Sequence, residues 1–152
     1  KSNQWSMNNL YKEARKRKVD PNRLIFAERL PLKKHLARYS LGDLALDTFN
    51  CNGGTTTSDA LWAGLPVLTK IGQSFAARYS ASLLTTIGLP ELITYSESEY
   101  EEKALYIASN PEEVIRLKSQ LKKLKETSTL YNPGLFTQDL ENIYNNLVQK
   151  LF

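Results

Sequence analysis

The sequence predicts one α/β domain, residues 1–152, built on a parallel sheet with flanking helices. Helical and strand patterns alternate before the chain turns mostly helical, as right-handed crossovers between parallel strands require. The 152 residues are enough to bury a core. Because the series begins with a helix, we expect the first strand of the sheet to be missing from this chain.

The composition is that of an ordinary globular domain. Hydrophobic residues make up 41% of the chain and charged residues 24%, which excludes a disordered chain. No apolar run approaches the roughly 20 residues of a membrane helix, and no signal peptide opens the chain, so no membrane partner is expected. The chain does not begin with Met, and we expect it to be a piece of a longer protein.

Neither the single cysteine nor the basic runs indicate a disulfide, a metal site or a nucleic-acid site. Cys51 has no companions for a disulfide or a metal site and fits a reducing, cytoplasmic location. The net charge is +4, and the basic residues are densest in 12–18 and 117–125, both within helical patterns. Because no base-stacking motif accompanies these runs, we expect solvated helix faces and no nucleic-acid partner.

Each element in the first half of the chain has a local signal. The patterns predict helices over residues 6–18 and 32–40 and from residue 59, and strands over 23–28, 44–49 and 67–70. Ser6 can cap the first helix, and Pro31 suits the start of the second. Gly64 and Pro66 end the third helix.

The second half begins with a helix over residues 73–88, which Gly88 closes because glycine suits the position after a helix. A short apolar run at 92–94 predicts a fourth strand. Ser96 and Glu99 then form a capping box ahead of a helix that continues to residue 110.

Residues 111–152 predict the C-terminal helices. Asn110 as the cap, Pro111 in the first turn and Glu113 as the reciprocal acid mark their start. The breaker YNPG separates two helices, each with an apolar stripe that predicts a packed face. The stripes are Val114, Leu117, Leu121 and Leu124 on the first helix, and Leu140, Ile143, Tyr144, Leu147 and Leu151 on the second.

The segment NCNGGTTT is the candidate binding site. It leaves the carboxyl end of a predicted strand and enters a helix, which is where ligands bind in open parallel sheets. Gly53 and Gly54 permit positive φ and a close approach of a ligand to the backbone. The amides of the first helical turn and the hydroxyls of Thr55, Thr56 and Thr57 favour an anion such as a diphosphate.

Asp59, which we expect in the first turn of that helix, can accept hydrogen bonds from ribose hydroxyls. The same residues also suit a plain helix start, in which Thr57 or Ser58 is the cap and Asp59 complements the helix dipole. The segment is neither a P-loop nor a GxGxxG motif. Spacing alone leaves both interpretations open.

His35 and Arg38 form a second candidate. They lie three residues apart on a predicted helix that also begins beyond a strand, so they share a face. A guanidinium can lie flat against a base, and an imidazole can donate to a phosphate or a ribose. A surface pair without a ligand fits the spacing as well.

Two stretches carry a resemblance to a known family. Residues 23–69 (RLIFAE to GLPVLT) and 88–100 (GLPELITYSESEY) resemble the C-terminal catalytic half of O-GlcNAc transferase and SPINDLY-like proteins, glycosyltransferase family 41. The block CNGGTTTSDALWAG is the specific motif, and the resemblance covers essentially the whole chain. It implies a GT-B architecture, in which this chain is the Rossmann-like, C-terminal nucleotide-binding domain.

The resemblance also implies an activity, the metal-independent and inverting transfer of a sugar from a nucleotide sugar to Ser or Thr hydroxyls of a protein, without a cofactor. Thr55 and Thr56 match residues that hold the donor diphosphate, and Asp59 matches a ribose-binding aspartate. His35 and Arg38 match residues around the nucleotide, with the arginine against the base.

Three further positions bear on the donor. Leu30 matches the position whose backbone group reads the base edge. Leu32 replaces a ribose-contacting lysine of O-GlcNAc transferase, and Gly54 replaces a histidine beside the pyrophosphate, as in plant SPINDLY. SPINDLY uses GDP-fucose and O-GlcNAc transferase uses UDP-GlcNAc. The sequence SDALWAG resembles O-GlcNAc transferase, so we expect UDP-GlcNAc and keep GDP-fucose as the alternative.

The family's proton-handling residues match no position in this chain. The resemblance therefore assigns it no catalytic residue, and we expect the chain alone to be inactive. The protein acceptor would bind through the other catalytic domain and through tetratricopeptide repeats. A non-catalytic scaffold joined to such repeats is the remaining alternative, and the exposed edge of the sheet predicts self-association.

Overall fold

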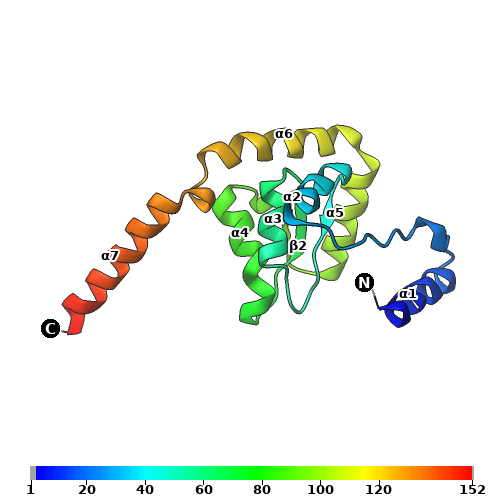
Figure 1. Cartoon of the computed structure of the whole chain (residues 1–152), viewed down its shortest axis with the longest axis horizontal. Coiled ribbons are helices and arrows are strands. Elements are labelled where there is room, and N and C mark those ends of the chain that lie inside the picture. Colours follow the sequence, from blue (N-terminus) through cyan, green and yellow to red (C-terminus); the bar gives the residue numbers. More distant parts are fainter. Residues whose placement is uncertain (1–2, 152) are drawn as a thin grey trace. The chain divides into compact units, whose positions relative to one another are not determined.

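The computed structural model of the chain describes residues 3–151. The chain divides into two compact units, Lys1–His35 and Leu36–Phe152. The first unit holds a helix and an extended segment, and the second holds the sheet and its core (Figure 1). That residues 1–152 form a single domain stays a prediction.

The first unit begins with α1 (Gln4–Lys16), which starts two residues earlier than predicted. The cap is Asn3, whose side chain accepts a hydrogen bond from the Trp5 amide at 3.0 Å. Ser6 therefore lies inside the helix, and its prediction as the cap was wrong. The basic side chains of residues 12–18 are exposed, as expected of a solvated face. Glu13 pairs with Lys16 and Arg17, and these hydrogen bonds lower the Glu13 pKa to about 2.

The strand predicted over residues 23–28 is absent. A 3₁₀ turn (Pro21–Arg23) is followed by an irregular segment in which Ile25 is 89% exposed. A strand needs a neighbour to pair its backbone groups, and the described part of this unit contains no other strand. The segment instead packs locally, with the Phe26 ring edge-on to Tyr11 at 5.3 Å.

The helix α2 (Leu32–Arg38) crosses the division at residue 35 and continues into a 3₁₀ turn, Tyr39–Leu41. Pro31 lies just before its first residue, and the His35 amide donates to the Pro31 carbonyl at 2.9 Å. The prediction that Pro31 opens this helix is confirmed to within one residue.

The second unit contains a parallel sheet of β1 (Ala45–Leu46), β2 (Val67–Lys70) and β3 (Ile93–Thr94), in the order β1-β2-β3. The predicted parallel α/β class is confirmed, and β2 has the predicted bounds. The strand expected over 44–49 is shorter, because the backbone turns away after the Asp47 amide has donated to the Leu68 carbonyl at 3.0 Å.

Three helices cover this sheet, and each of them contacts β2. The crossover helices α3 (Thr55–Trp62) and α4 (Tyr79–Ile87) lie on one face, and α5 (Glu97–Ser109) lies on the other (Figure 1). The helix predicted over 73–88 begins instead as a 3₁₀ turn (Phe75–Arg78) and becomes α-helical at Tyr79. Gly88 closes α4 at a φ of +90°, as predicted.

Two further helix starts were predicted from capping residues. Ser96 caps α5 by accepting a hydrogen bond from the Glu99 amide at 3.1 Å, which confirms that start. Asn110 stands before α6 (Pro111–Thr127), but its side chain donates to the Tyr106 carbonyl at 2.6 Å. The cap position of Asn110 and the first-turn Pro111 are confirmed, but the Asn110 side chain binds the end of α5 and makes no cap hydrogen bond to α6.

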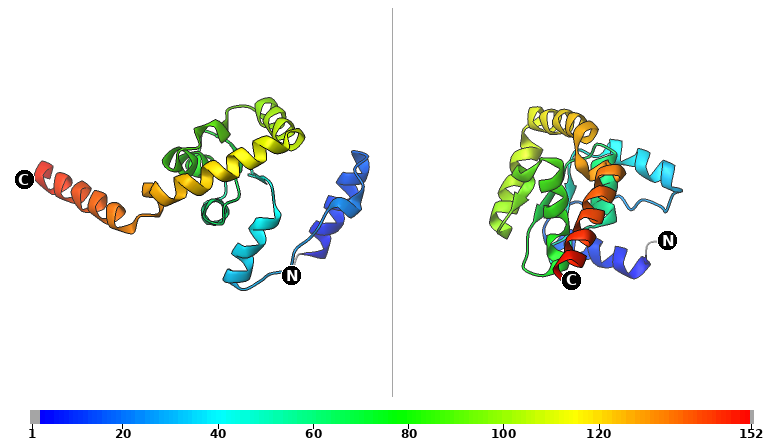
Figure 2. Two further views of the ribbon diagram at one scale, coloured as in Figure 1. Left: turned by 90° about the horizontal axis from the view of Figure 1, so that it is seen from above. Right: turned by 90° about the vertical axis from the view of Figure 1, so that its left-hand side faces the viewer.

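The two C-terminal apolar stripes differ in burial. Leu117 and Leu121 on α6 are fully buried, which confirms the first stripe. A 3₁₀ turn (Thr129–Tyr131) leads to α7 (Pro133–Leu151), which projects away from the sheet (Figure 2). Ile143 and Leu147 are 55% and 52% exposed, so the prediction of a packed face on this helix was wrong within the described residues.

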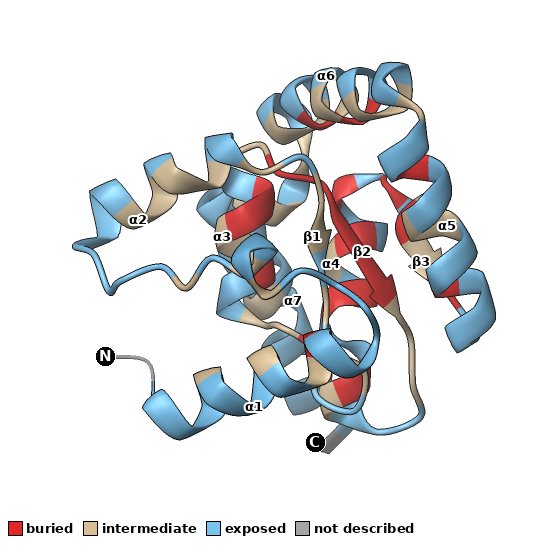
Figure 3. Cartoon of the chain, turned by 90° about the vertical axis from the view of Figure 1, so that its right-hand side faces the viewer, coloured by how far each residue is buried: buried red, intermediate tan, exposed pale blue. Residues whose placement is uncertain are grey.

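The core of the second unit lies between the sheet and its helices (Figure 3). Its largest fully buried apolar side chains come from β2, from the helices α3 to α6 and from the turns between these elements, so burial is concentrated around β2. These side chains are Leu61, Val67, Leu68, Leu84, Ile87, Leu89, Leu92, Ile107, Leu117 and Leu121.

Candidate functional site

The candidate site is the loop between the carboxyl end of β1 and the start of α3. The Asp47 carboxylate organises its first half. One oxygen, Oδ1, accepts hydrogen bonds from the Thr48 amide at 2.9 Å and the Gly53 amide at 2.8 Å. The other, Oδ2, accepts from the Thr69 hydroxyl of β2 at 2.7 Å. Asp47 therefore ties both ends of the loop to the sheet.

Ser80, on α4, holds the second half of the loop. Its hydroxyl donates to the Gly53 carbonyl at 3.0 Å and lies 2.8 Å from the Thr57 hydroxyl. Ser80 and Thr57 are both buried. Because the Ser80 proton is used by Gly53, Thr57 is the donor of the second hydrogen bond. Neither Asp47 nor Ser80 was predicted from the sequence, since their roles depend on contacts between separate elements.

Further hydrogen bonds close the loop on itself. The Thr48 hydroxyl donates to the Cys51 carbonyl at 2.6 Å, and the Asn52 side-chain amide donates to the Thr48 carbonyl at 2.7 Å. The Asn52 carbonyl oxygen Oδ1 is buried and has no hydrogen-bond partner in the part of the chain that the structure describes. Cys51 is exposed, and residues 3–151 hold no cluster of three or more potential metal ligands.

The two glycines of the loop serve different purposes. A Cβ on Gly53 would lie 2.6 Å from the hydroxyl oxygens of Thr56 and Thr57, so this position requires glycine for space. Gly54 is the residue before α3, and a Cβ there would meet nothing within 4 Å. Neither glycine uses the positive φ that its residue type permits, because among the described glycines only Gly64 and Gly88 have it.

The start of α3 presents unpaired amides. Gly54 occupies the cap position, so the alternative in which Thr57 or Ser58 caps the helix was wrong. The amides of Thr55, Thr56 and Thr57 donate to no acceptor among residues 3–151. Thr55 and Thr56 are also exposed, and their hydroxyls add donors beside these amides. Unpaired amides and the helix dipole together favour an anion here.

Asp59 lies farther along α3 than expected. It is the fifth residue of the helix rather than a first-turn residue, because α3 begins at Thr55. Its carboxylate is partly buried and accepts no hydrogen bond from a described residue. Burial raises the pKa values of Tyr39 and Tyr131, and the negative charge of Asp59 raises both further. The carboxylate therefore acts electrostatically on both tyrosines, and its hydrogen-bonding capacity is not used by any described residue.

A small recess opens beside this helix start. It has a volume of about 150 Å³ and lies between the carboxyl half of β1 and one side of α3. Its lining includes the two threonines Thr56 and Thr57 and the carboxylate residue Asp47. The remaining lining residues are Tyr39, Ala45, Leu46, Ala60 and Val67.

The other predicted site residues are placed less completely. Arg38 ends α2 and is partly buried, and its positive charge acts on Tyr39 in opposition to that of Asp59. Arg38 and Asp59 therefore both act electrostatically on Tyr39. His35 and Leu30 belong to the first unit, where His35 is partly buried and Leu30 is 36% exposed. Their placement at the Thr-rich loop stays a prediction.

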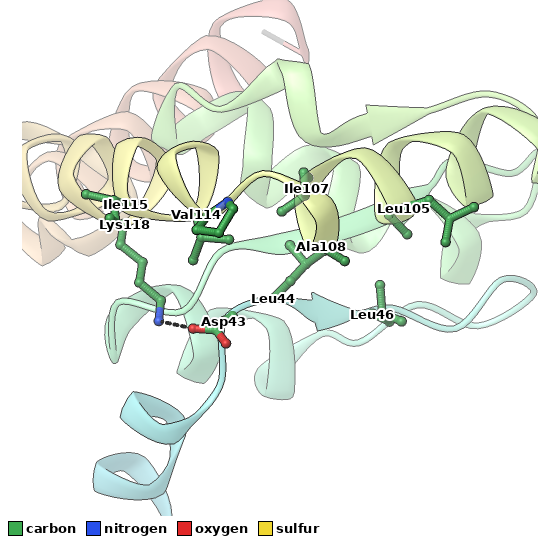
Figure 4. Close-up of a pocket in the computed structure, with 11 residues that line it drawn as sticks. Asp43, Leu44, Leu46, Leu105, Ile107, Ala108, Val114, Ile115 and Lys118 are labelled. Atoms are coloured by element: carbon green, nitrogen blue, oxygen red, sulfur yellow. Dashed lines mark hydrogen bonds and ion pairs between the residues drawn. The ribbon is translucent and has the colours of Figure 1, made fainter. Parts of the chain in front are cut away.

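A larger groove lies elsewhere in the second unit (Figure 4). It has a volume of about 710 Å³ and is lined by apolar side chains of β1, α5 and α6, among them Leu46, Leu105 and Ile115. At one end Lys118 pairs with Asp43 at 2.9 Å. None of the predicted site residues lines this groove, and its two charged lining residues, Asp43 and Lys118, are paired with each other. We therefore place the candidate site at the Thr-rich loop.

Comparison with known proteins decides the family. The sequence profile of glycosyl transferase family 41 matches residues 4–140. The chain belongs to this family. The parallel sheet with its flanking helices is accordingly a Rossmann-like domain of the GT-B architecture. Among residues 3–151, no helix combines the length and the apolarity that crossing a membrane requires.

Several relatives of the family 41 chain are glycosyltransferases by name. It is 30% identical to the UDP-N-acetylglucosamine–peptide N-acetylglucosaminyltransferase of Caenorhabditis elegans, over 86% of this chain and 11% of that protein. It is 39% identical to the probable enzyme SPINDLY of Petunia hybrida (74% of this chain, 12% of that one) and 36% identical to the probable enzyme SEC of Arabidopsis thaliana (83% and 13%).

A solved structure extends the likeness to three dimensions. A mutant of the Thermobaculum terrenum O-GlcNAc transferase superposes with a TM-score of 0.88 at 33% identity, over 95% of this chain. The chain spans 28% of that protein, as it spans only 11–13% of the curated relatives.

Proposed function

We propose that the complete protein is a protein O-glycosyltransferase and that this chain binds its nucleotide-sugar donor. The observation that carries the proposal is the start of α3, where the unpaired amides of Thr55, Thr56 and Thr57 stand beside a recess. Membership in glycosyl transferase family 41 supports it, since the matched relatives are named as glycosyltransferases.

The donor diphosphate would lie at the start of α3. The amides after Gly53 and Gly54 and the hydroxyls of Thr55 and Thr56 would donate to its oxygens. Anion binding of this kind needs no metal, and we expect none. The open space at Gly54 leaves the diphosphate free access to the backbone.

The nucleoside would extend over the neighbouring residues. Asp59 retains the free acceptors that ribose hydroxyls need, and the Arg38 charge acts on the same tyrosine, Tyr39, as the Asp59 charge does; a guanidinium there can lie against a base. His35 and the backbone at Leu30 would complete the nucleotide site. These assignments follow the resemblance residue by residue.

The chemistry supplied by this chain would be electrostatic. Transfer breaks the bond between the anomeric carbon and a diphosphate oxygen, and the acceptor hydroxyl oxygen forms the new bond from the opposite face, with inversion. Negative charge develops on the departing diphosphate, and preorganised donors at the start of α3 would stabilise it. No residue of this chain is assigned to remove the acceptor proton, so the chain alone should not catalyse the transfer.

The donor that we favour is UDP-GlcNAc, because the matched relatives carry UDP-N-acetylglucosamine in their names. GDP-fucose is the alternative, since Gly54 stands where plant SPINDLY also has glycine. The protein acceptor and any tetratricopeptide repeats belong to parts of the complete protein outside this chain. A scaffold without transferase activity is the third candidate, because Leu32 replaces a ribose-contacting lysine of O-GlcNAc transferase.

Calorimetric titration of the complete protein with UDP, UDP-GlcNAc, GDP and GDP-fucose tests the proposal. We expect UDP and its sugar to bind, and Asp59→Ala to weaken binding roughly tenfold or more because hydrogen bonds to a charged group are lost. Asp139→Ala, a carboxylate exposed on α7, is the control and should bind normally.

The outcomes separate the candidates. Preference for GDP identifies the fucosyl alternative, and nucleotide binding without transfer to a Ser/Thr peptide identifies the scaffold. Absence of binding by all four nucleotides overturns the proposed function.

A further inference from the structure

We propose that Asp47 and Ser80 are positioning residues for the donor diphosphate, acting through Gly53. The inference rests on the proposed function and adds to it the two side chains that fix the direction of the diphosphate-binding amides. We call the pair the Gly53 clamp. Neither residue needs to touch the nucleotide.

Both backbone polar groups of Gly53 are hydrogen-bonded to side chains, one at the start of the loop and one on α4. The amide donates to Asp47, at the end of β1, over 2.8 Å. The carbonyl accepts from Ser80, on α4, over 3.0 Å. Gly53 immediately precedes the cap residue Gly54. The clamp therefore fixes the backbone just before the unpaired amides at the start of α3.

The Asp47 end of the clamp is anchored in the sheet. Thr69, which is fully buried in β2, donates to Asp47 Oδ2 at 2.7 Å, and the Thr48 amide donates to Oδ1 at 2.9 Å. Three donors therefore surround this carboxylate. Their hydrogen bonds stabilise the negative charge, which reduces its cost beside a site for an anion.

The loop also leaves little freedom at the clamped residue. A Cβ on Gly53 would lie 2.6 Å from the hydroxyl oxygens of Thr56 and Thr57, so the glycine fits closely under the first turn of α3. Binding that depends on several aligned donors is sensitive to displacements of this backbone. Loss of either end of the clamp should consequently weaken diphosphate binding even in folded protein.

Two buried threonines in neighbouring strands provide a matched test. Thr69 and Thr94 are both fully buried, and both donate a hydroxyl hydrogen bond. Thr69 donates to Asp47, whereas Thr94 donates to the Thr69 carbonyl at 2.9 Å and does not reach the loop. Thr69→Val and Thr94→Val therefore remove equivalent groups, and only the first releases the clamp.

The experiment is calorimetric titration of the complete protein with UDP and with GDP, after the folded fraction has been measured by circular dichroism. We expect Thr69→Val, Asp47→Ala and Ser80→Ala each to raise the Kd of the bound nucleotide roughly tenfold or more. Asp47→Asn should restore most of the affinity lost in Asp47→Ala, because its amide oxygen still accepts from Gly53. Thr94→Val should keep the wild-type Kd.

The Kd separates positioning from folding. A variant that is only less stable shows a Kd raised by no more than the reciprocal of its folded fraction, which circular dichroism measures, whereas loss of positioning raises the Kd beyond that factor. If Thr69→Val, Asp47→Ala and Ser80→Ala keep the wild-type Kd, or if Thr94→Val or Asp47→Asn loses as much affinity as Asp47→Ala, the inference is overturned and the proposed function stands. If the wild-type protein binds neither nucleotide, the proposed function itself fails.

Discussion

The Tyr100 hydroxyl donates a hydrogen bond to the Asp47 carbonyl oxygen at 3.1 Å. This contact joins α5, on one face of the sheet, to the loop that leads to α3 on the other face. The Tyr100 ring also meets Phe49 of the same loop edge-on, at a centroid distance of 5.0 Å. The candidate site is therefore supported from both faces of the sheet.

Ionisation of Tyr100 should destabilise the fold at high pH. Burial and the nearby Asp47 carboxylate raise the Tyr100 pKa from 10.0 to about 12. Because the folded-state pKa is raised, the stabilisation is complete below the unfolded pKa and is lost as the pH rises from about 10 to about 12. We expect the free energy of unfolding to fall across this range, as urea titrations at several pH values can measure.

Tyr100→Phe is the control for this prediction, since lysines titrate in the same range. At pH 9 we expect the variant to be less stable by about 1 kcal/mol, because the hydrogen bond to Asp47 is lost. The difference from wild type should shrink as the pH rises above 10, since only the wild type loses the contribution of neutral Tyr100. A constant difference across the range would contradict the account.

Gly53→Ala should destabilise the loop. The added Cβ would meet the Thr56 and Thr57 hydroxyl oxygens at 2.6 Å, and overpacking of this kind costs about 1–3 kcal/mol. The same change at Gly54 meets nothing within 4 Å, so we expect a smaller loss there. Thermal unfolding of the two variants compares these costs, and equal costs would show that space at Gly53 is not the constraint.

The buried apolar stripe should account for much of the contribution that α6 makes to the stability of the fold. Leu117 is fully buried, so Leu117→Ala should lower the free energy of unfolding by about 2–5 kcal/mol. Ile115, two residues earlier and 68% exposed, is the control, and Ile115→Ala should cost less than about 1 kcal/mol. Chemical denaturation of both variants measures the difference, and a Leu117 cost as small as that of Ile115 would argue against this packing.

Local signals explain the features of the fold that were predicted correctly. The bounds of β2, the glycine after α4 and the cap at Ser96 each depend on a few neighbouring residues. The strand expected over 23–28 and the packed face expected on α7 depend on partners elsewhere, and the described residues supply none for either. A strand pattern or an apolar stripe indicates what a segment can pair with, and does not ensure that the partner is beside it.

In the candidate site, too, the residues with a local signal were predicted and those that depend on distant contacts were not. Thr55 and Thr56 were predicted from a glycine-rich segment entering a helix, and the structure places them at that helix start. Asp47 and Ser80 were missed, because they reach Gly53 from 6 and 27 residues away in the sequence. An aspartate inside the apolar pattern predicted as a strand over 44–49, six residues before the first glycine of the loop, is the one signal that was available.

The most direct test of donor binding compares two threonine pairs. Thr55 and Thr56 are exposed at the start of α3, and Thr85 and Thr86 are exposed on α4, where their hydroxyls donate to helix carbonyls. In calorimetric titrations of the complete protein with UDP and GDP, Thr55→Val/Thr56→Val should raise the nucleotide Kd roughly tenfold or more. Thr85→Val/Thr86→Val should leave it unchanged. An unchanged Kd in the first double variant would contradict the claim that the start of α3 holds the diphosphate.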